Sequence, residues 1–450
     1  MRDRLVLLAI ITVIWSMIEL VRFVIPVQSL FIVTFLLVLY TIFTTAAFSH
    51  QDRRLRKKPQ RLNLDYEPTV CIMIPAHNEE TVIEKTIENI AAIDYEKFEI
   101  FVIDDRSDDD TAKVIKEVEK NYGGKVKAII RDKDAFPGKS AVLNDALALT
   151  NADVICVFDA DARVKKDFLK VLLPYLAPEE VGAVQARKII INKELNILTA
   201  CQNNEYTLDN HLQLSRDSIN GAVELRGNGQ LIKRAALLEV DGWNNNTITD
   251  DLDLSTKLHL NGWGIRYCPI GEVYEEAILK PIPLLKQRRR WVEGSIRRYL
   301  DYCVDVATSE VISLRASFDM LAYMLEFVIP VLLVGSIIVQ SLKYMKGYEN
   351  HLLSTAAVGV GICLFFFLGI VYSLRKYDKQ PVFKAIGQAI ITGIYMVVLW
   401  IPLVTWIVFK ILIFKRDMNW GKTSHGLENE SIKPVKQVEA AVEVATNEVI

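Results

Sequence analysis

The sequence is poor in cysteine, and its cysteines form no recognisable pattern of metal ligands or disulfides. Six are scattered along 450 residues. None forms a C-x-x-C pair, and none lies near a histidine at the spacing of a zinc finger. Most lie in apolar runs, where cysteine is typically a small buried side chain in a reducing compartment. We therefore expect neither a structural zinc site nor a disulfide framework.

A strong net charge is also missing. The formal charge is −2 at pH 7, so we do not expect a nucleic acid as a partner. Apolar residues make up 51% of the chain, and charged residues still make up 24%. This mixture is unusual for a membrane bundle alone or for a soluble domain alone. It predicts a soluble domain flanked by membrane segments.

Residues 1–48 are predicted to form two N-terminal transmembrane helices. Positions 5–48 are almost continuously apolar. Because a span needs about 20 apolar residues, the chain is expected to turn near Arg22–Gln28. Arg2 and Arg4 precede the apolar run, as in a signal peptide. The run has no small-residue cleavage site before the second span, so we favour retained membrane anchors.

The next segment, 49–67, is predicted to be a basic cytoplasmic linker. It contains the stretch QDRRLRKKPQR, in which six of eleven residues are Arg or Lys. Basic residues beside a span mark the cytoplasmic side of a membrane. We therefore expect a multi-pass protein of a bacterial inner membrane, with the downstream domain in the cytoplasm.

Residues 68–317 have the pattern of an α/β domain. Apolar runs of strand length alternate with amphipathic helical patterns that begin near Thr81, Asp110 and Lys139. This alternation predicts a mostly parallel, Rossmann-like sheet with helices on both faces. Ligands bind such sheets at the carboxyl ends of the strands, so the polar residues there form the candidate site. The predicted strands contain VCIMIPA, FEIFVIDD, KVKAIIR and DVICVFDAD.

Residues 318–414 are again apolar and predict three or four transmembrane or interfacial helices. The last part, 382–414, has Trp400 and Pro402 near its middle. This pattern predicts either two short spans or one span followed by an interfacial helix. The polar, acidic segment 415–450 is predicted to be a disordered cytoplasmic tail.

Acidic residues follow three of the predicted strands. Glu79 lies just after the first strand. Asp104 and Asp105 end the second, and Asp159 and Asp161 follow the last. Carboxylates gathered at one sheet edge repel each other unless a positive charge lies between them. A divalent ion with hard oxygen ligands, Mg²⁺ or Mn²⁺, is the natural partner.

The pair Asp159 and Asp161 comes directly after an apolar strand, so both carboxylates can face one metal ion that also holds a diphosphate. Such an ion neutralises a leaving diphosphate as a Lewis acid, although solvated Asp pairs are also common in turns. Lys139 follows Gly138 at the start of a predicted helix. This position suits either phosphate contact or an ordinary helix start, because the upstream glycine of a P-loop is missing.

Two further clusters leave a structural and a functional interpretation open. Asp250 and Asp251 can place charge at a helix N-terminus, or one of them can take a proton from an attacking hydroxyl. Gln287, Arg290 and Trp291 lie shortly before a predicted span. They fit a basic membrane-surface patch, or an arginine that binds a phosphate beside a ring that stacks on a sugar or on uracil.

In this order, these stretches resemble the family 2 glycosyltransferases with a GT-A fold. More narrowly, they are similar to the membrane-bound branch that includes cellulose, hyaluronan and poly-N-acetylglucosamine synthases. The resemblance runs from Pro75 to Trp291, and the flanking spans also match that branch. Each stretch alone is weak evidence, but their shared order and spacing are specific. The matching stretches are PAHNEE, VIDDRSDDDT, GKSAVLN, FDADA, ITDDLDLS and QRRRW.

The resemblance implies that a UDP-sugar donor binds at the strand ends. Asp104 and Asp105 would contact uracil or ribose. Asp159 and Asp161 would flank the diphosphate, with Asp161 as the direct ligand of Mg²⁺ or Mn²⁺. The implied nucleotide-binding set is completed by Ala76, Glu79 and Lys139.

The resemblance also implies an inverting transfer. Asp251 takes the last place of the family's Thr-Glu-Asp and would be the base that deprotonates the acceptor hydroxyl. Asp250 stands where the family usually has Glu, which leaves open which of the two is the base. Gln287, Arg290 and Trp291 match the Q-x-x-R-W signature, which closes the donor site, contacts the diphosphate and lines the acceptor site.

The acceptor is left open by the sequence, and we favour a growing β-linked exopolysaccharide that passes through the spans. The alternative is β-glucosyl transfer to diacylglycerol, a membrane lipid. It rests on GAVELRGNGQ and TITDDLDLSTKLHL, which are similar to stretches of cyanobacterial glucosyldiacylglycerol synthases. A second alternative is a non-catalytic membrane scaffold.

Overall fold

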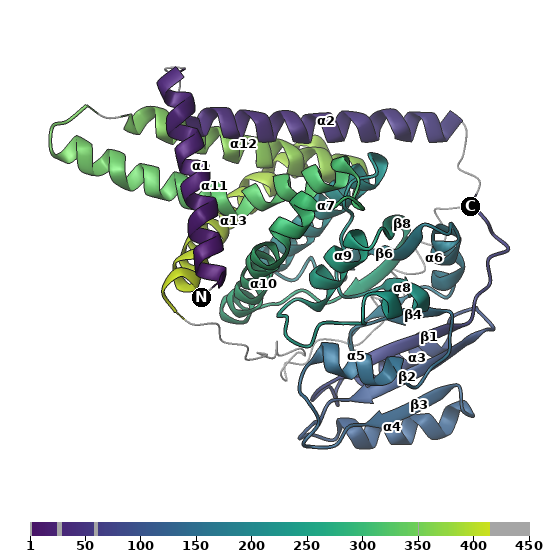
Figure 1. Ribbon diagram of the computed structural model, residues 1–450. Coiled ribbons are helices and arrows are strands. Elements are labelled where there is room, and N and C mark those ends of the chain that lie inside the picture. Colours follow the sequence, from purple (N-terminus) through teal and green to yellow (C-terminus); the bar gives the residue numbers. More distant parts are fainter. Residues whose placement is uncertain (1, 25–28, 58–61, 350, 415–450) are drawn as a thin grey trace.

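The structure is a computed structural model in which an α/β domain packs against a group of long helices (Figure 1). The second part of the predicted N-terminal turn, 25–28, part of the predicted basic linker, 58–61, and the predicted tail, 415–450, lie outside the described residues. The described residues are 2–24, 29–57, 62–349 and 351–414.

The α/β domain is built on an eight-stranded sheet with the strand order β3-β2-β1-β4-β7-β6-β8-β5. The first four strands pair in parallel, as do β6 and β8, while β7 and β5 run antiparallel to their neighbours. The predicted mostly parallel α/β sheet is confirmed. The strands are β1 (Val70–Ala76), β2 (Phe98–Asp104), β3 (Val126–Ile130), β4 (Val154–Val157), β5 (Arg163–Val164), β6 (Val181–Ile190), β7 (Gln230–Lys233) and β8 (Gly264–Glu275).

Helices cover both faces of the sheet, which explains why its central strands are apolar throughout. In β1, Ile72 and Ile74 pack into one core, and Cys71 and Met73 pack into the other. The first core is closed by α3 (Ile83–Ala91), α4 (Thr111–Glu119), which the short 3-10 helix Lys120–Tyr122 extends, and α6 (Phe168–Leu176). The second is closed by α5 (Lys139–Leu147), α8 (Arg234–Glu239) and α9 (Asp250–Leu260).

Helix α7 (Ile197–Ser218) is an element that the sequence analysis did not anticipate. It lies between the sheet and the long helices, in contact with β6 and β8 on one side and with α2, α12 and α13 on the other. Polar side chains such as Asn204 and His211 are therefore buried. Asn204 donates a hydrogen bond to Thr392 Oγ1 at 2.8 Å. The polar composition of this helix serves interior contacts rather than a solvated surface.

Helix α10 (Pro281–Thr308) joins the α/β domain to the long helices. Its residues Val292 and Ile296 pack in one cluster with Phe327 and Val404. Glu293 forms an ion pair with Lys410 at 2.8 Å. The residues of the predicted Q-x-x-R-W signature lie in the first part of this helix, next to the membrane-side elements.

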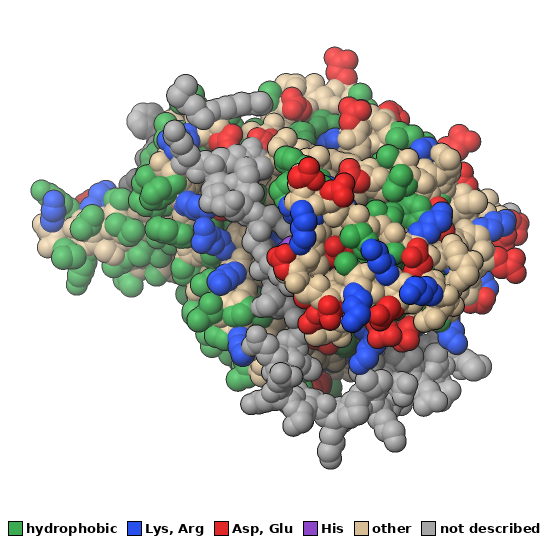
Figure 2. Space-filling view, turned by 90° about the horizontal axis from the view of Figure 1, so that it is seen from below, with side chains coloured by type: hydrophobic (Ala, Val, Ile, Leu, Met, Phe, Trp, Pro, Cys, Tyr) green, Lys and Arg blue, Asp and Glu red, His purple; other side chains and the backbone are tan. Residues whose placement is uncertain are grey.

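The long helices are apolar and group together. Among the described residues, three helices are long and apolar enough to cross a membrane, which indicates membrane association. Figure 2 shows hydrophobic side chains gathered on the arm at its left, where Figure 1 places α11 and α12. The long helices are α1 (Arg2–Val24), α2 (Ser29–Lys57), α11 (Leu314–Met345), α12 (Leu352–Tyr377) and α13 (Val382–Ile413).

The predicted division of 382–414 into two elements is wrong, because α13 is one continuous helix. Pro402 lies inside it and removes one backbone N–H from the hydrogen-bond ladder. Such a loss is tolerated in apolar helices that pack against neighbours. In this chain, α10, α11 and α12 all contact α13.

Candidate active site

The ends of β1 and β2 lie side by side and form one edge of the site. Ala76 is paired in register with Asp104, and the backbone N–H of Asp105 donates to Ala76 O at 2.7 Å. Asp104 turns into the protein, where its Oδ2 accepts a hydrogen bond from Ser107 N at 3.2 Å. Its side chain therefore holds the loop after β2.

Asp105 is held in its ionised form by three groups around it. Arg106 and Arg131 form ion pairs with it at 2.9 and 2.6 Å, and the Gly138 N–H donates to it at 3.3 Å. Burial alone would raise the pKa of Asp105, but the Arg106 and Gly138 hydrogen bonds and the positive charges outweigh burial and lower it. The carboxylate is thus fixed and acts as a pure hydrogen-bond acceptor.

Lys139 lies among acids of two separate elements, the loop after β4 and the start of α9. Its Nζ is 2.6 Å from Asp159 Oδ1 and donates to Gly227 O at 3.2 Å. Burial by itself lowers the pKa of Lys139, but the negative charges of Asp159, Asp250 and Asp251 outweigh burial and raise it. Lys139 is therefore a positive charge at the place where the sequence predicts repelling carboxylates.

Asp250 and Asp251 begin helix α9 but do not cap it, since the N-cap residue is Thr249. Burial and repulsion from Asp250 raise the pKa of Asp251 to about 6, although Lys139 acts in the opposite direction. The next acid, Asp253, is structural, because it accepts hydrogen bonds from Asn244 and Tyr302 at 3.2 and 3.1 Å. Asp250 and Asp251 therefore line the site, while Asp253 supports the helix that carries them.

The backbone beside Asp251 requires glycine. Gly227 has a φ of +76°, and a Cβ there would lie 3.2 Å from Asp251 Oδ2. A similar close approach joins α10 to the start of α9, because a Cβ on Gly294 would lie 2.4 Å from Thr249 Cγ2. The two glycines allow the backbone to approach Asp251 from one side and α10 to approach α9 from the other.

Two of the predicted signature residues on α10, Gln287 and Trp291, contact Arg288, a buried residue of the same stretch. The Arg288 guanidinium lies 4.2 Å from the centroid of the Trp291 ring and donates to Gln287 Oε1 at 3.2 Å. Glu205 of α7 forms an ion pair with Arg288. A cation held over an indole face stabilises the orientation of the ring.

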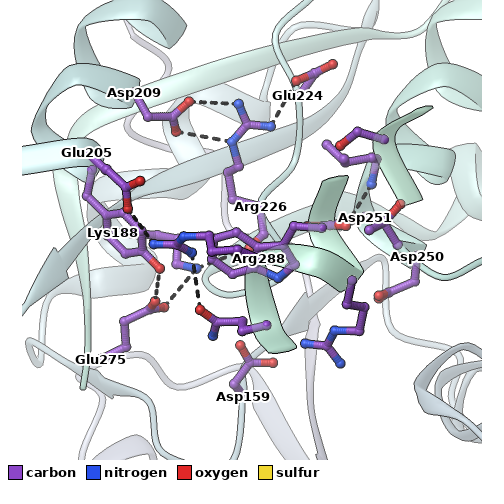
Figure 3. A pocket seen from close by; sticks show the side chains of 18 of the residues that line it. Asp159, Lys188, Glu205, Asp209, Glu224, Arg226, Asp250, Asp251, Glu275 and Arg288 are labelled. Atoms are coloured by element: carbon purple, nitrogen blue, oxygen red, sulfur yellow. Dashed lines mark hydrogen bonds and ion pairs between the residues drawn. The ribbon is translucent and has the colours of Figure 1, made fainter. Parts of the chain in front are cut away.

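These elements enclose a cavity of about 410 Å³ (Figure 3). In Figure 3, Asp250 and Asp251 lie on one side of it, and Lys188, Glu205 and Glu275 lie on the other. Asp104 is the predicted site residue that does not line the cavity. The predicted residues that do line it are Ala76, Glu79, Asp105, Lys139, Asp159, Asp161, Asp250, Asp251, Gln287, Arg290 and Trp291.

One charged group that sequence reasoning missed lies around Glu275. Lys188 pairs with Glu275 at 2.9 Å, and Tyr206 donates to Glu275 Oε1 at 2.6 Å. Asn228 donates to Glu275 Oε2 at 3.1 Å and accepts from the Asp159 N–H at 3.2 Å. Glu275 therefore links α7 and β6 to the loop that carries Asp159.

A second missed group surrounds Arg226. It pairs with Asp209 at 2.8 Å and with Glu224 at 2.9 Å, and Glu224 also pairs with Arg298 of α10 at 2.6 Å. The stretch GAVELRGNGQ contains Glu224 and Arg226, so its resemblance to glucosyldiacylglycerol synthases was the available signal. No local periodicity marks the pairs with Asp209 and Arg298, because those two residues lie on α7 and α10.

The carboxylates of the cavity suit a divalent ion that shares its ligands with a substrate. Within the described residues, no group of three or more His, Cys, Asp or Glu side chains is placed to hold a metal ion by itself. Asp159 and Asp161 nevertheless both line the cavity, and Asp159 is 40% exposed. Mg²⁺ and similar ions are commonly held by one or two carboxylates together with substrate phosphate oxygens. The donor set therefore fits such an ion.

The α/β domain has a GT-A-like architecture. The fold resembles a mannosyltransferase from Pyrobaculum calidifontis that was solved in complex with GDP-Man and Mn²⁺. The TM-score is 0.57 at 18% sequence identity, over 81% of this chain and 99% of that chain.

The chain belongs to glycosyltransferase family 2 and is therefore an enzyme, a hexosyltransferase. Residues 68–294 match the model of the family described as "Glycosyltransferase like family 2". The alternative of a non-catalytic scaffold is not retained.

Two kinds of curated relatives match the chain over different lengths. The beta-monoglucosyldiacylglycerol synthase of Synechocystis sp. is 34% identical over 87% of this chain and 84% of its own length. Its counterpart in Trichormus variabilis is 36% identical over 80% and 76%. The poly-beta-1,6-N-acetyl-D-glucosamine synthase of Staphylococcus aureus is 32% identical over 53% and 57%. The likeness to the lipid enzymes thus extends into the long helices.

Proposed function

We propose that this protein transfers a glucosyl group from UDP-glucose to diacylglycerol and so makes a β-linked glycolipid. The observation that carries the choice of acceptor is the extent of the likeness to beta-monoglucosyldiacylglycerol synthases, which covers 80% or more of this chain. The likeness to a polysaccharide synthase covers 53%. This balance favours the glycolipid over the exopolysaccharide acceptor that we favoured from the sequence.

In the proposed reaction, Asp251 takes the proton of the free lipid hydroxyl. The hydroxyl oxygen then attacks the anomeric carbon on the side opposite to the diphosphate. The bond from that carbon to the phosphate oxygen breaks, UDP leaves with the bonding electrons, and the configuration inverts. Burial and the neighbouring Asp250 raise the pKa of Asp251, which makes its carboxylate a stronger base than that of an ordinary aspartate.

The donor is proposed to lie across the strand ends. Asp105 accepts hydrogen bonds from the uridine, next to Ala76 and Glu79. Lys139, at the start of α5, and Arg290 contact the diphosphate. Asp104 acts indirectly, because it holds the loop on which Asp105 lies.

Asp161 and Asp159 are proposed to hold a Mg²⁺ or Mn²⁺ ion together with oxygens of the diphosphate. When bound, such an ion neutralises negative charge on the leaving group. Asp159 is anchored from two sides for this role, by Lys139 on its carboxylate and by Asn228 on its backbone.

We also propose the arrangement in the membrane that the sequence predicts. The helices α1, α2, α11, α12 and α13 are embedded in a bacterial inner membrane, and the domain at 68–317 faces the cytoplasm. The basic stretch at 51–61 supports this orientation. The site then lies at the membrane surface, where a lipid hydroxyl is available.

The proposal is tested by identifying the product. Purified protein in mixed micelles with diacylglycerol, UDP-glucose and Mn²⁺ is expected to release UDP and to form a lipid that extracts into chloroform and carries one additional hexose by mass. UDP-N-acetylglucosamine and UDP-galactose are expected to be poorer donors than UDP-glucose. A sugar polymer made without added lipid would contradict the proposal and restore the polysaccharide acceptor.

The activity should depend on pH through the pair Asp250 and Asp251. Because the pKa of Asp251 is raised to about 6, the carboxyl keeps its proton below that pH and cannot act as a base. We expect kcat/KM to fall on the acid side with an apparent pKa near 6. Asp250→Asn removes the repulsion and should move this limb to lower pH, as measured by UDP release. If the acid-side fall of kcat/KM stays at the same pH in Asp250→Asn, or moves to higher pH, Asp250 does not raise the pKa of Asp251.

A further inference from the structure

The catalytic cavity continues past Asp251 and Trp291 into the long helices. Its lining includes residues of α7, α11, α12 and α13 in addition to those of the sheet. The helices α11 and α13 are candidate membrane spans, and so is most of α12. We call the apolar part of this lining the acceptor wall. It consists of Leu208, Leu212, Phe327, Phe366, Met396 and Trp400.

The acceptor wall consists of two apolar groups that line the same cavity. Leu208, Leu212, Phe366 and Met396 belong to one hydrophobic cluster between α7, α12 and α13. The rings of Phe327 and Trp400 lie 5.9 Å apart. Polar groups on this side of the cavity include Tyr323 and Glu326 of α11, which lie one turn apart on the same helix face.

The aliphatic part of the acceptor wall, Leu208, Leu212 and Met396, suits an acyl chain better than it suits a sugar polymer. Each residue of a polysaccharide carries several hydroxyls, which would lose hydrogen bonds to water against Phe366, Met396 or Leu208. An acyl chain gains free energy from the same surface. Polar residues that share the cavity with the acceptor wall, including Gln202, Asp209, Tyr323 and Glu326, can meet the ester and hydroxyl oxygens of the glycerol unit.

We infer that the acceptor wall binds the acyl part of a lipid alcohol, and that Phe366 and Met396 determine the choice of a lipid over a polymer. The inference rests on the proposed function and locates its acceptor. The free hydroxyl of the lipid reaches Asp251, the glycerol oxygens lie at Tyr323 and Glu326, and an acyl chain lies along the acceptor wall. The continuity of the cavity from the sheet edge into the candidate spans supports this arrangement.

The inference is tested with matched substitutions on two sides of the same helices. Met396→Gln and Phe366→Ser place polar groups on the acceptor wall. Val398→Gln and Leu364→Ser make the same changes at positions that are 69% and 55% exposed. We expect the first pair to raise the KM for diacylglycerol by at least about tenfold. The effect should fall on the KM for diacylglycerol rather than on the KM for UDP-glucose, and the second pair should behave as wild type.

Acyl length provides a second measurement. Wild type should prefer long-chain over short-chain diacylglycerol, and this preference should be reduced in Met396→Gln and Phe366→Ser. Equal effects of the inner and outer substitutions, or an unchanged preference, would overturn the inference while leaving glycolipid synthesis intact. Absence of any glycolipid with the wild-type protein would instead refute the proposed function.

A cross-linking experiment on the unaltered protein covers the case in which a variant fails to fold. A diacylglycerol with a photoreactive diazirine in one acyl chain is illuminated in the presence of UDP. Labelled peptides from α7, α12 or α13 around the acceptor wall support the inference when excess diacylglycerol suppresses the label. Labels confined to the outward faces of α12 and α13 would overturn it.

Discussion

Asp251→Asn is expected to lower kcat for glycolipid formation by about 100- to 10,000-fold, the usual contribution of a general base. Asparagine has nearly the same shape, so it keeps the hydrogen bond from the Leu252 N–H. It cannot accept the proton of the lipid hydroxyl. The rate of UDP release in the presence of diacylglycerol measures the effect, and UDP-glucose binding should change little.

Two further variants serve as controls for Asp251→Asn. Asp94→Asn changes an exposed carboxylate that pairs with Lys170, and it should behave as wild type. Asp250→Asn should retain more activity than Asp251→Asn, because Asp250 is assigned to the pKa of its neighbour rather than to the proton transfer. If Asp250→Asn is the more damaging change, the two roles are reversed.

Asp161→Ala is expected to lower activity at least about 100-fold, because stabilisation of the leaving diphosphate by a metal ion is worth several kcal/mol. Removal of divalent ions with EDTA should have a similar effect on the wild-type enzyme. Added Mn²⁺ should restore the wild type, and it should not restore Asp161→Ala.

Binding can be followed separately from activity. Electron paramagnetic resonance of Mn²⁺ in the presence of UDP should show a bound ion in the wild type and a weaker one in Asp161→Ala. The exposed variant Asp94→Ala serves as the control for a lost carboxylate. Full activity of the wild-type enzyme in EDTA would show that Lys139 and Arg290 alone neutralise the leaving group.

The position of Lys139 adds to this account of charge in the site. From the sequence, the repelling carboxylates required a positive charge between them, and a metal ion was the expected answer. The structure provides a lysine at hydrogen-bonding distance from Asp159. A metal ion and Lys139 can act together, because an incoming diphosphate brings additional negative charge to the same place.

The sequence by itself determined the first half of the sheet and indicated most of the candidate residues that line the cavity. Apolar runs of strand length predict β1 and β2, and Gly138 before a helical pattern predicts the start of α5. The carboxyl ends of parallel strands meet at one edge for any such sequence. Asp105, Asp159 and Lys139 could therefore be placed in one site before their distances were known.

The tertiary structure alone decided which other charges complete that site. Arg226 pairs with Asp209, Glu275 with Lys188 and Arg288 with Glu205. Each pair joins two different elements, and no pattern within one segment records it. Helix α7 shows the same limit, since its polar residues resemble a solvated surface until the sheet and the long helices enclose them. Asp104 and Asp105 are neighbours in sequence, yet they face opposite ways because successive side chains at a strand end alternate. Local patterns fix the elements, and only their packing in space fixes which side chains meet.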